Sequence, residues 1–350
     1  MKHVFITGAA GFIGGYITEC FVKQDWHVFA LVHRTASPSL EKVARDGAVT
    51  IIHGDLKDVA AIHAKLTGEL ARRHGELDAI IHCGGRASDT GWHREFRKTN
   101  YEAVTHLADM SMALNAGRFV FISTTDVCGL RDYHGEQEDD LPLGARPSNP
   151  YPEFKIAAEH YIRKTMPSSR FSIIRPAQVW GTGDKTLTPR IVDFLRASPW
   201  IVHFGKWRGR NRWPLAHVRN VATTAFLAAT TAEAAGKTIN VVDDERTTMD
   251  EFYRLLARIY LPDKHFRTIT LPFVVGQGFA FCISLVSNLL NLKRPFADPS
   301  YYALYAVSHN LDFGNRRMQA LFKQAGCTPF TREAGIKEAK AQPSGRLGLG

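Results

Sequence analysis

Three groups of residues in this 350-residue chain have types and spacing suited to phosphate binding or proton transfer. The first is the triplet Gly8, Gly11 and Gly14, spaced G-x-x-G-x-x-G after the apolar run Val4–Ile6. Glycines allow a tight turn and the close approach of a ligand, and the N–H groups that open a helix attract a pyrophosphate. The first gap is one residue longer than in the usual G-x-G-x-x-G fingerprint. The triplet therefore predicts a strand, a phosphate-binding turn and a helix, although such turns also occur for packing alone.

The second group is the pair Tyr151 and Lys155, which are four residues apart and share one face of a predicted helix. Pro152 is compatible with the first turn of that helix. A nearby ammonium favours a phenolate, so we expect Lys155 to lower the pKa of Tyr151 from its ordinary value of about 10. The phenol would then donate and accept a proton near neutral pH. A single Y-x-x-x-K pair often arises by chance, and its weight comes from its position downstream of the glycine turn.

The third group is the run of hydroxyls Ser123, Thr124 and Thr125, at the end of a strand predicted over Phe119–Ser123. A hydroxyl at the carboxyl end of a buried strand can form a hydrogen bond with a substrate oxygen and with a tyrosine. Serine and threonine also end strands for reasons of turn geometry alone. The run is therefore a candidate proton-transfer site only in combination with the other two groups.

Apolar, strand-like runs alternate with helix-compatible stretches from residue 1 to about residue 180, which predicts an α/β fold with a doubly wound parallel sheet. The predicted strands are His3–Thr7, His27–Val32, Val49–His53, Ala79–His82, Phe119–Ser123, Phe171–Arg175 and, later in the chain, Thr238–Val242. The predicted helices are Gly14–Gln24, Leu40–Asp46, Val59–Leu70, Phe96–Ala116, Tyr151–Lys164, Pro189–Ala197 and Asn220–Thr231. Ligands of such sheets bind beyond the carboxyl ends of the strands, where all three groups fall.

The pattern loosens after Pro176, and the C-terminal third is mainly helical. We predict a dinucleotide-binding domain over residues 1–180 that also receives residues 214–242. Residues 181–213 and 243–338 would form a smaller substrate-binding lobe. The small, polar and glycine-rich stretch 339–350 is expected to be a disordered tail.

The chain carries a net charge of +10, but its lysines and arginines form no compact block. Its densest basic cluster is Lys206, Arg208, Arg210 and Arg212, which we interpret as a solvated surface rather than a nucleic-acid site. A phosphate-bearing cofactor or an anionic membrane would also account for some of this charge. The five cysteines form no metal-ligand pattern, so we expect free thiols in a reducing compartment, a cytoplasmic protein without a signal peptide, and no metal.

The stretch from Thr268 to Leu292 contains no charged residue. Its length would suffice for a membrane span, but glycine, serine and asparagine dilute its hydrophobicity. Three settings stay open: a buried or groove-lining helix, an interfacial helix that contacts a membrane, and a true span. Lys293 and Arg294 follow directly, as expected for a helix end that meets anionic lipid headgroups.

In combination, the glycine turn, the S-T-T strand end, the Y-x-x-x-K pair and the segment Arg175–Gly181 resemble the extended short-chain dehydrogenase/reductase family, within the NAD-dependent epimerase/dehydratase superfamily. The resemblance covers about residues 1–335 and implies a Rossmann-type fold. The helical C-terminal third and the segment His217–Ala222 are similar to the 3β-hydroxysteroid dehydrogenase-like branch. Members of that branch act on hydroxyls or ketones of sterols and other apolar molecules.

This resemblance implies that Tyr151 is the acid/base, that Lys155 binds the nicotinamide ribose and tunes Tyr151, and that Thr124 orients the substrate oxygen. Ser123 is next to Thr124 and could take its place, whereas Cys128 stands where the family usually has tyrosine. The implied cofactor-binding residues are Gly8, Gly11, Phe12, Ile13, Gly14, His33, Arg34, Asp55, Leu56, Cys83, Gly84, Lys155 and Pro176. The substrate residues that we predict are Trp92, Asp126, Gln178, Val179, Trp180 and Arg212, and Trp180, Trp200, Trp207 and Trp213 are expected to wall an apolar pocket.

The end of the second predicted strand favours NADP over NAD. NAD-specific relatives have an acid there that binds the ribose hydroxyls, whereas this chain has Val32 followed by His33 and Arg34. An arginine near that position accommodates a 2′-phosphate.

The expected function is hydride transfer between nicotinamide and a hydroxyl or ketone carbon of an apolar substrate, with Tyr151 moving the proton. One alternative is a nucleotide-sugar epimerase or dehydratase with retained NAD, in which Arg208, Arg210 and Arg212 bind a pyrophosphate. Another is a non-catalytic protein that senses NADP. The resemblance also implies a homodimer that pairs through the helices at 96–116 and 151–164.

Overall fold

A seven-stranded sheet forms the centre of the molecule, with strand order β11-β7-β5-β4-β1-β2-β3. The computed structural model describes residues 1–88, 91–144, 149–289 and 301–341. Every neighbouring pair in this sheet is parallel, so the predicted doubly wound sheet is confirmed. Its strands are β1 (His3–Thr7), β2 (His27–Val32), β3 (Val49–His53), β4 (Ala79–His82), β5 (Arg118–Ile122), β7 (Phe171–Pro176) and β11 (Thr238–Val241).

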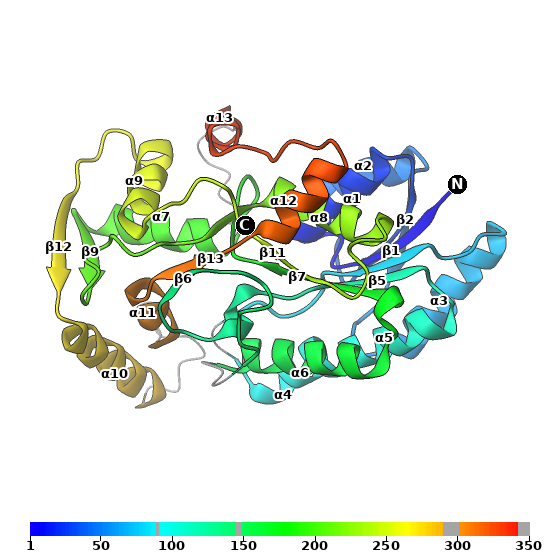
Figure 1. Cartoon of the computed structure of the whole chain (residues 1–350), viewed down its shortest axis with the longest axis horizontal. Coiled ribbons are helices and arrows are strands. Elements are labelled where there is room, and N and C mark those ends of the chain that lie inside the picture. Colours follow the sequence, from blue (N-terminus) through cyan, green and yellow to red (C-terminus); the bar gives the residue numbers. More distant parts are fainter. Residues whose placement is uncertain (89–90, 145–148, 290–300, 342–350) are drawn as a thin grey trace.

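Helices cover both faces of the sheet (Figure 1). One face carries α1 (Phe12–Val22), α2 (Pro38–Arg45), α8 (Val218–Thr230) and α12 (Arg316–Gln324). The other carries α3 (Val59–Arg72), α5 (Ala103–Ala113) and α6 (Pro150–Thr165). The central strands are buried on both sides between two apolar clusters, which explains why they read as continuous hydrophobic runs.

The helix predicted over Phe96–Ala116 is interrupted. Its first part is α4 (His93–Arg97), which runs through a π-helical turn, η1 (Lys98–Glu102), into α5. Asn100 lies buried in this turn, where its side chain accepts from Arg86 N (2.7 Å) and donates to Arg86 O (2.9 Å). The turn thus fixes the loop that follows β4, a contact that helical periodicity does not predict.

A smaller lobe lies at the left-hand end of Figure 1. It contains α7 (Leu187–Ala197), β9 (Trp200–Phe204), α9 (Met249–Tyr260), β12 (Arg267–Leu271), α10 (Phe273–Leu289) and α11 (Tyr301–Ser308). Three two-stranded sheets pair β12 with β9, β10 (Leu215–His217) with β8 (Gln178–Trp180), and β13 (Leu311–Phe313) with β6 (Tyr133–Glu136). Short 3-10 helices, η2 (Thr125–Cys128) and η3 (Ser168–Arg170), and the last helix α13 (Arg332–Ala341) complete the described elements.

The C-terminal part of the chain differs from its predicted division. Helix α12 falls within residues 243–338, which were predicted to belong to the substrate-binding lobe, but it packs on β11 and α8 of the dinucleotide-binding domain. Two hydrogen bonds join the segment before α12 to β11 and its end: Asn240 Nδ2 donates to Gly314 O (3.0 Å), and Asn315 Nδ2 donates to Val242 O (2.8 Å). The predicted tail is wrong for residues 339–341, which belong to α13; residues 342–350 lie outside the described residues.

The uncharged stretch 268–292 is not one helix. Its first residues form β12, and Pro272 separates this strand from α10, which ends at Leu289. Residues 290–292 lie outside the described residues. None of the helices described is both long and apolar enough to cross a bilayer.

Candidate active site

The turn between β1 and α1 can be built only with glycine. Gly8 has a φ of +70°, and Gly11 N donates to Gly8 O (2.9 Å). A Cβ on Gly14 would lie 2.1 Å from Gly8 O, and a Cβ on Gly8 would lie 2.9 Å from Gly84 Cα. Helix α1 begins at Phe12 without a side-chain cap, so its first N–H groups are available to an anion.

The segments that follow β3 and β4, which contain Leu56 and Gly84, lie next to this turn, and we call them the floor of the site. Gly84 follows β4, and its N–H donates to Thr7 Oγ1 (3.0 Å). A Cβ on Gly84 would lie 2.8 Å from Leu56 Cδ1, so the segments after β3 and β4 pack closely. Cys83, beside Gly84, is half-buried, and burial raises the pKa of its thiol to about 12. It is therefore a neutral thiol near neutral pH.

Polar side chains border the floor beyond β2 and β3. His33 Nε2 lies 3.4 Å from Asp55 Oδ2, and Arg34 next to His33 is exposed. Asp55 Oδ1 also accepts from the N–H of Lys57 (3.0 Å). A glycine cradle beside an open helix start, with basic residues beyond β2, fits the phosphates and ribose of a dinucleotide.

Helix α6 brings Tyr151 and Lys155 to the carboxyl end of β5. Asn149 caps the helix by accepting from Tyr151 N (2.9 Å). The Lys155 ammonium donates to Ile122 O (2.7 Å) and lies 4.5 Å from the centre of the Phe121 ring. Burial lowers the pKa of Lys155 to about 8, and the charge of Glu159 opposes this shift. The side chain is therefore a buried cation near neutral pH.

Tyr151 forms a hydrogen bond with the Thr124 hydroxyl, so the phenol and the strand-end hydroxyl meet. The expected lowering of the tyrosine pKa by Lys155 is wrong for this structure. Burial and then the charge of Asp126 raise the pKa of Tyr151, and the Thr124 hydrogen bond only partly offsets them. The Lys155 ammonium is instead bound to the main chain of Ile122. The phenol is therefore protonated near neutral pH.

Ser123 and Thr124 have different surroundings although they are adjacent. Ser123 Oγ donates to Glu159 Oε1 (2.7 Å), and Glu159 is completely buried. The same carboxylate accepts from Arg175 Nε (2.9 Å) and Nη2 (2.7 Å). The Ser123 hydroxyl is therefore held by a buried ion pair, while the Thr124 hydroxyl lies against the Tyr151 phenol.

The buried pair Glu159 and Arg175 is a part of the site's support that sequence reasoning missed. Burial alone would raise the pKa of Glu159, but Arg175 and the hydrogen bonds hold it below its ordinary value. The pair links α6 to β7, and through Ser123 it also links both to the end of β5. Glu159 lies four residues after Lys155, so helical spacing could have indicated it.

The predicted substrate residues lie in different places. Asp126 is in η2, two residues after Thr124, and its charge reaches Tyr151. Trp92 precedes α4 and is 82% exposed; its neighbour His93 contacts Glu153 of α6 (3.1 Å), which places α4 beside the start of α6. Gln178 and Val179 are half-buried in β8. Of the predicted cofactor residues, Pro176 is buried at the end of β7, and Phe12 and Ile13 are half-buried at the start of α1.

Trp180 and Arg212 do not join this site. The Trp180 ring is buried, and its Nε1 donates to Asp243 Oδ2 (2.8 Å). Asp243 also accepts from His217 N (2.9 Å) and Asn220 Nδ2 (2.8 Å), and its burial raises its pKa to about 6. This carboxylate, which connects β8, β10 and α8, was missed by sequence reasoning.

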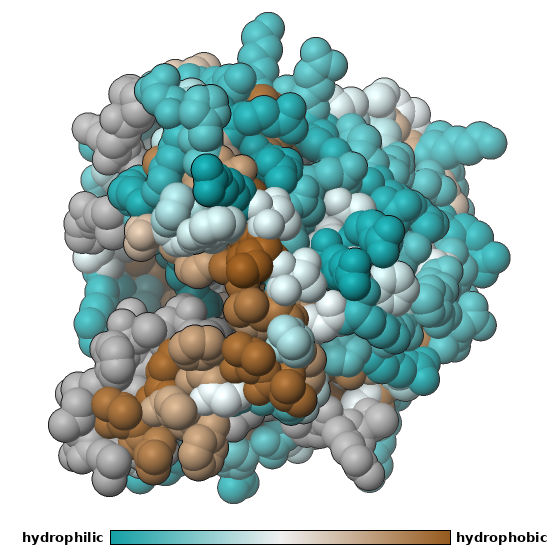
Figure 2. All heavy atoms as spheres, turned by 90° about the vertical axis from the view of Figure 1, so that its left-hand side faces the viewer, coloured by the Kyte–Doolittle hydropathy of each residue, from teal (hydrophilic) through white to brown (hydrophobic). Residues whose placement is uncertain are grey.

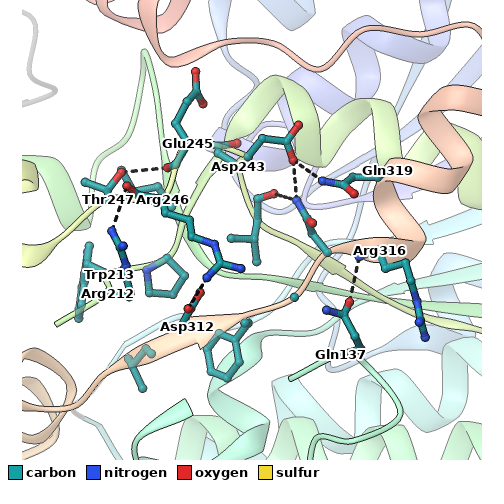
Figure 3. Close-up of a pocket in the computed structure, with 18 residues that line it drawn as sticks. Gln137, Arg212, Trp213, Asp243, Glu245, Arg246, Thr247, Asp312, Arg316 and Gln319 are labelled. Carbon is teal, nitrogen blue, oxygen red and sulfur yellow. Dashed lines mark hydrogen bonds and ion pairs between the residues drawn. The ribbon is translucent and has the colours of Figure 1, made fainter. Parts of the chain in front are cut away.

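Arg212 lines a separate pocket of about 350 Å³ between the segment after β11 and β13. In Figure 3, Arg246 pairs with Asp312 (2.6 Å). Gln319 Nε2 also donates to Asp244 Oδ1 (2.9 Å). The lining mixes charged, polar and apolar residues, and neither the glycine turn nor the Tyr151 pair contributes to it.

The expected apolar pocket walled by four tryptophans is not formed. Trp180 and Trp213 are buried in the core, and Trp200 is partly exposed on β9. Trp207 donates to Asp132 Oδ1 (3.1 Å). The rings therefore do not gather around one pocket, although Trp180 ends β8 and Trp213 precedes its partner strand β10.

The parallel sheet, the glycine turn and the Thr124–Tyr151–Lys155 group define a dinucleotide-dependent enzyme of the short-chain dehydrogenase type. The model of the NAD dependent epimerase/dehydratase family matches residues 4–242, which is more than half of the chain. The chain therefore belongs to this family, and it is an NAD(P)-dependent oxidoreductase of the extended short-chain dehydrogenase/reductase type.

The chain is similar to curated relatives in sequence and to solved structures in fold. The 2-alkyl-3-oxoalkanoate reductase of Stenotrophomonas maltophilia is 27% identical over 74% of this chain and 76% of its own length. The sterol-4-alpha-carboxylate 3-dehydrogenase (decarboxylating) of Dictyostelium discoideum is 24% identical over 84% of this chain and 87% of its own. The structure of UDP-glucuronic acid 4-epimerase from Bacillus cereus, with UDP-glucuronic acid and NAD, has a TM-score of 0.67 at 18% identity and covers 97% of this chain and 99% of its own. At that identity, the structural likeness supports the fold alone.

Proposed function

We propose that this enzyme reduces a ketone, or oxidises the corresponding hydroxyl, on an apolar sterol-like or long-chain substrate, and that it prefers NADP(H). The observation that carries the proposal is the hydrogen bond between the Thr124 hydroxyl and the Tyr151 phenol, one helical turn from the buried Lys155, at the carboxyl edge of the sheet that holds the glycine turn. The names of the two relatives, a keto-acid reductase and a sterol dehydrogenase, support the substrate class.

Each residue of the group has a role that its surroundings support. A bound nicotinamide supplies or accepts the hydride. Tyr151 gives its proton to the substrate oxygen in the reductive direction and takes it back in the oxidative direction. Because burial keeps the phenol protonated, its resting state suits ketone reduction. Thr124 orients the same oxygen, and Lys155, whose buried ammonium donates to Ile122 O, would hold the nicotinamide ribose.

The cofactor would be held along the floor described above. The α1 N-terminus and the glycine turn would bind the pyrophosphate, Asp55 and Leu56 would contact the adenine, and Lys155 would bind the nicotinamide ribose. His33 and the exposed Arg34 would face the 2′-phosphate of NADP.

The substitution Tyr151→Phe tests the catalytic role. We expect loss of NADPH oxidation with unchanged NADPH affinity, assayed by absorbance with sterol, long-chain keto and sugar-nucleotide substrates. Tyr161→Phe is the matched control, because Tyr161 lies on the same helix but bonds Asp109 (2.8 Å), away from Thr124. Full turnover by Tyr151→Phe would overturn the proposal.

The same panel separates the alternatives. Conversion of a sugar nucleotide without net cofactor consumption would establish an epimerase or dehydratase. Cofactor binding without turnover on any substrate would establish a sensing protein.

The substitution Arg34→Gln tests the cofactor preference. Losing a charge-assisted contact with the 2′-phosphate should weaken NADPH binding about tenfold and leave NADH binding unchanged. Arg45→Gln, at the exposed end of α2, is the control and should change neither. Isothermal titration with both cofactors measures the outcome, and an equal loss for both would contradict a preference for NADP.

We also propose a homodimer that pairs through the outer surfaces of α5 and α6. Tyr101 and Tyr161 contact each other between η1 and α6, and Met112 on α5 is 38% exposed. Analytical ultracentrifugation should give a dimer that Met112→Asp dissociates; a monomer at all concentrations would contradict this.

A further inference from the structure

Helix α10 is attached to the small lobe by one of its sides. The Phe273 ring lies 5.1 Å from the Tyr305 ring, and Gln277 Nε2 donates to the Tyr305 hydroxyl (3.2 Å). A Cβ on Gly276 would lie 2.6 Å from Leu304 Cδ1. Positions 273, 276 and 277 are spaced as one face of a helix, and this face packs on α11.

The opposite side of α10 is exposed, yet it is equally apolar. Val274 is 69% exposed, Phe279 58%, Phe281 57% and Leu285 47%. No residue of the helix is charged. A surface helix of a water-soluble lobe normally turns polar or charged side chains outward. Helix α10 therefore leaves an apolar side in water.

The exposed apolar surface continues onto the neighbouring strands. Figure 2 shows hydrophobic side chains gathered on the end of the molecule that carries α10, β12 and β9. We define the apolar patch as the exposed side chains Trp200, Ile269, Val274, Val275, Phe279, Phe281 and Leu285. A gathered patch of this kind marks an interaction surface, unlike single exposed apolar residues.

Positive charge borders the apolar patch. The Arg267 guanidinium lies 5.8 Å from the centre of the Trp200 ring. Arg254, whose Nε pairs with Asp250 (2.7 Å), also donates through Nη2 to Thr268 next to Ile269 (2.8 Å). Between residues 254 and 289 the sequence has four basic residues, Arg254, Arg258, Lys264 and Arg267, and one acid, Asp263.

We propose that the apolar patch is a docking surface for an anionic lipid bilayer. The aromatic and aliphatic side chains would enter the headgroup–acyl boundary, and the flanking lysines and arginines would attract anionic headgroups. The helix would lie in the interface, because its other side stays packed on α11. This surface would give the enzyme access to substrates dissolved in the membrane, an inference that rests on the proposed function.

Charge favours a bilayer over a second copy of the chain as the occupant. Two copies that met through the patch would bring their basic borders together, and like charges across an interface are unfavourable. An anionic bilayer is complementary to the same border.

Co-sedimentation with vesicles tests the docking surface. The full-length protein, without cofactor or substrate, is mixed with vesicles of phosphatidylcholine and with vesicles that also contain phosphatidylglycerol. We expect binding to the mixed vesicles that weakens as salt is added. Phe279→Asp and Phe281→Asp should each weaken it about tenfold or more, because a buried aromatic is replaced by a charge.

Three controls make the result decisive. Ala60→Asp, which adds the same charge on the exposed side of α3 in the other lobe, should bind vesicles like the wild type. Arg267→Gln should reduce the preference for anionic vesicles. All variants should keep the wild-type thermal midpoint and NADPH affinity, which separates this proposal from the catalytic one.

Two results would overturn the proposal. One is equal vesicle binding, or none, by the wild type and both phenylalanine variants. The other is a concentration-dependent dimer that Phe281→Asp dissociates while vesicle binding is absent, which would assign the patch to a second copy.

Discussion

The adjacent hydroxyls of Ser123 and Thr124, at the end of β5, have different partners and different roles. Ser123 is bonded to the buried Glu159, whereas Thr124 is bonded to the Tyr151 phenol. The alternation of side chains along an extended segment sends neighbours to opposite sides. One hydroxyl therefore stabilises the fold, and the other is placed for proton transfer.

This division predicts opposite effects of two substitutions. Thr124→Val should lower kcat about 10²-fold with little change in stability, because the substrate oxygen loses its orienting hydroxyl. Ser123→Ala should keep kcat but lower the free energy of unfolding by about 1–3 kcal/mol, because Glu159 loses a buried donor. Steady-state kinetics and thermal unfolding measure both. The reverse pattern would show that Ser123 is the orienting group.

Lys155 makes stability depend on pH in a defined direction. Its folded-state pKa of about 8 lies below its ordinary value of 10.5, so the unfolded chain binds more protons between these two pH values. The contribution of Lys155 to the free energy of unfolding therefore rises with pH over that window, by up to about 3 kcal/mol. Denaturant titrations at several pH values should show this rise in the wild type relative to Lys155→Met. A constant difference between the two would contradict it.

At the scale of elements, the β1–α1 connection depends on backbone packing as much as on ligand binding. Gly14 and Gly15 are adjacent in the first turn of α1 but face different surroundings. A Cβ on Gly14 would meet Gly8 O at 2.1 Å, whereas a Cβ on Gly15 would lie 3.7 Å from Ala9 O, an ordinary contact. The helix start can approach the strand end only at glycine.

Gly14→Ala should therefore distort the turn, weaken NADPH binding about tenfold or more and lower stability by about 1–3 kcal/mol. Gly15→Ala should keep NADPH affinity and stabilise α1 by up to about 1 kcal/mol, since alanine is the better helix former. Fluorescence titration with NADPH and thermal unfolding measure the pair. Equal effects of both substitutions would show that the backbone contact is unimportant.

Element boundaries that depend on the local sequence were predicted more closely than those that depend on contacts with distant residues. Strands β1 to β4 begin and end where their apolar runs predict, because strands buried on both faces need continuous apolar sequence. The π-helical turn before α5 escaped prediction because it depends on a contact between Asn100 and Arg86. The stretch 268–292 is interrupted at Pro272 because proline has no backbone N–H and disrupts a helix. The absence of charged residues, which suggested one helix, does not reveal this break.

At the scale of the whole molecule, the last helix ties the two ends of the chain together. Glu338 on α13 accepts from Tyr16 on α1 (3.1 Å) and pairs with Arg219 on α8 (3.0 Å). A Cβ on Gly335 would lie 2.7 Å from the Trp180 ring and 3.0 Å from the His217 ring. Helix α13 thus covers the core between α1, α8 and β8.

Gly335→Val should push α13 away from these rings and lower the free energy of unfolding by about 1–3 kcal/mol. Gly68→Ala in α3 is the control, because a Cβ there would have no atom within 4 Å, and it should be neutral or stabilising. Thermal unfolding measures both. An unchanged midpoint for Gly335→Val would show that α13 packs loosely.

The sequence by itself determined the parallel sheet, the glycine turn and the pair Tyr151 and Lys155, because apolar runs and short spacings encode them locally. The tertiary structure decided which hydroxyl meets the phenol, the upward shift of the Tyr151 pKa, the separation of Trp180 and Arg212 from the site, and the open apolar side of α10. These features depend on burial and on partners distant in the chain, such as Glu159 for Ser123 and Asp243 for Trp180. No local pattern of residues specifies such contacts, because they exist only once the sheet has brought its strand ends together.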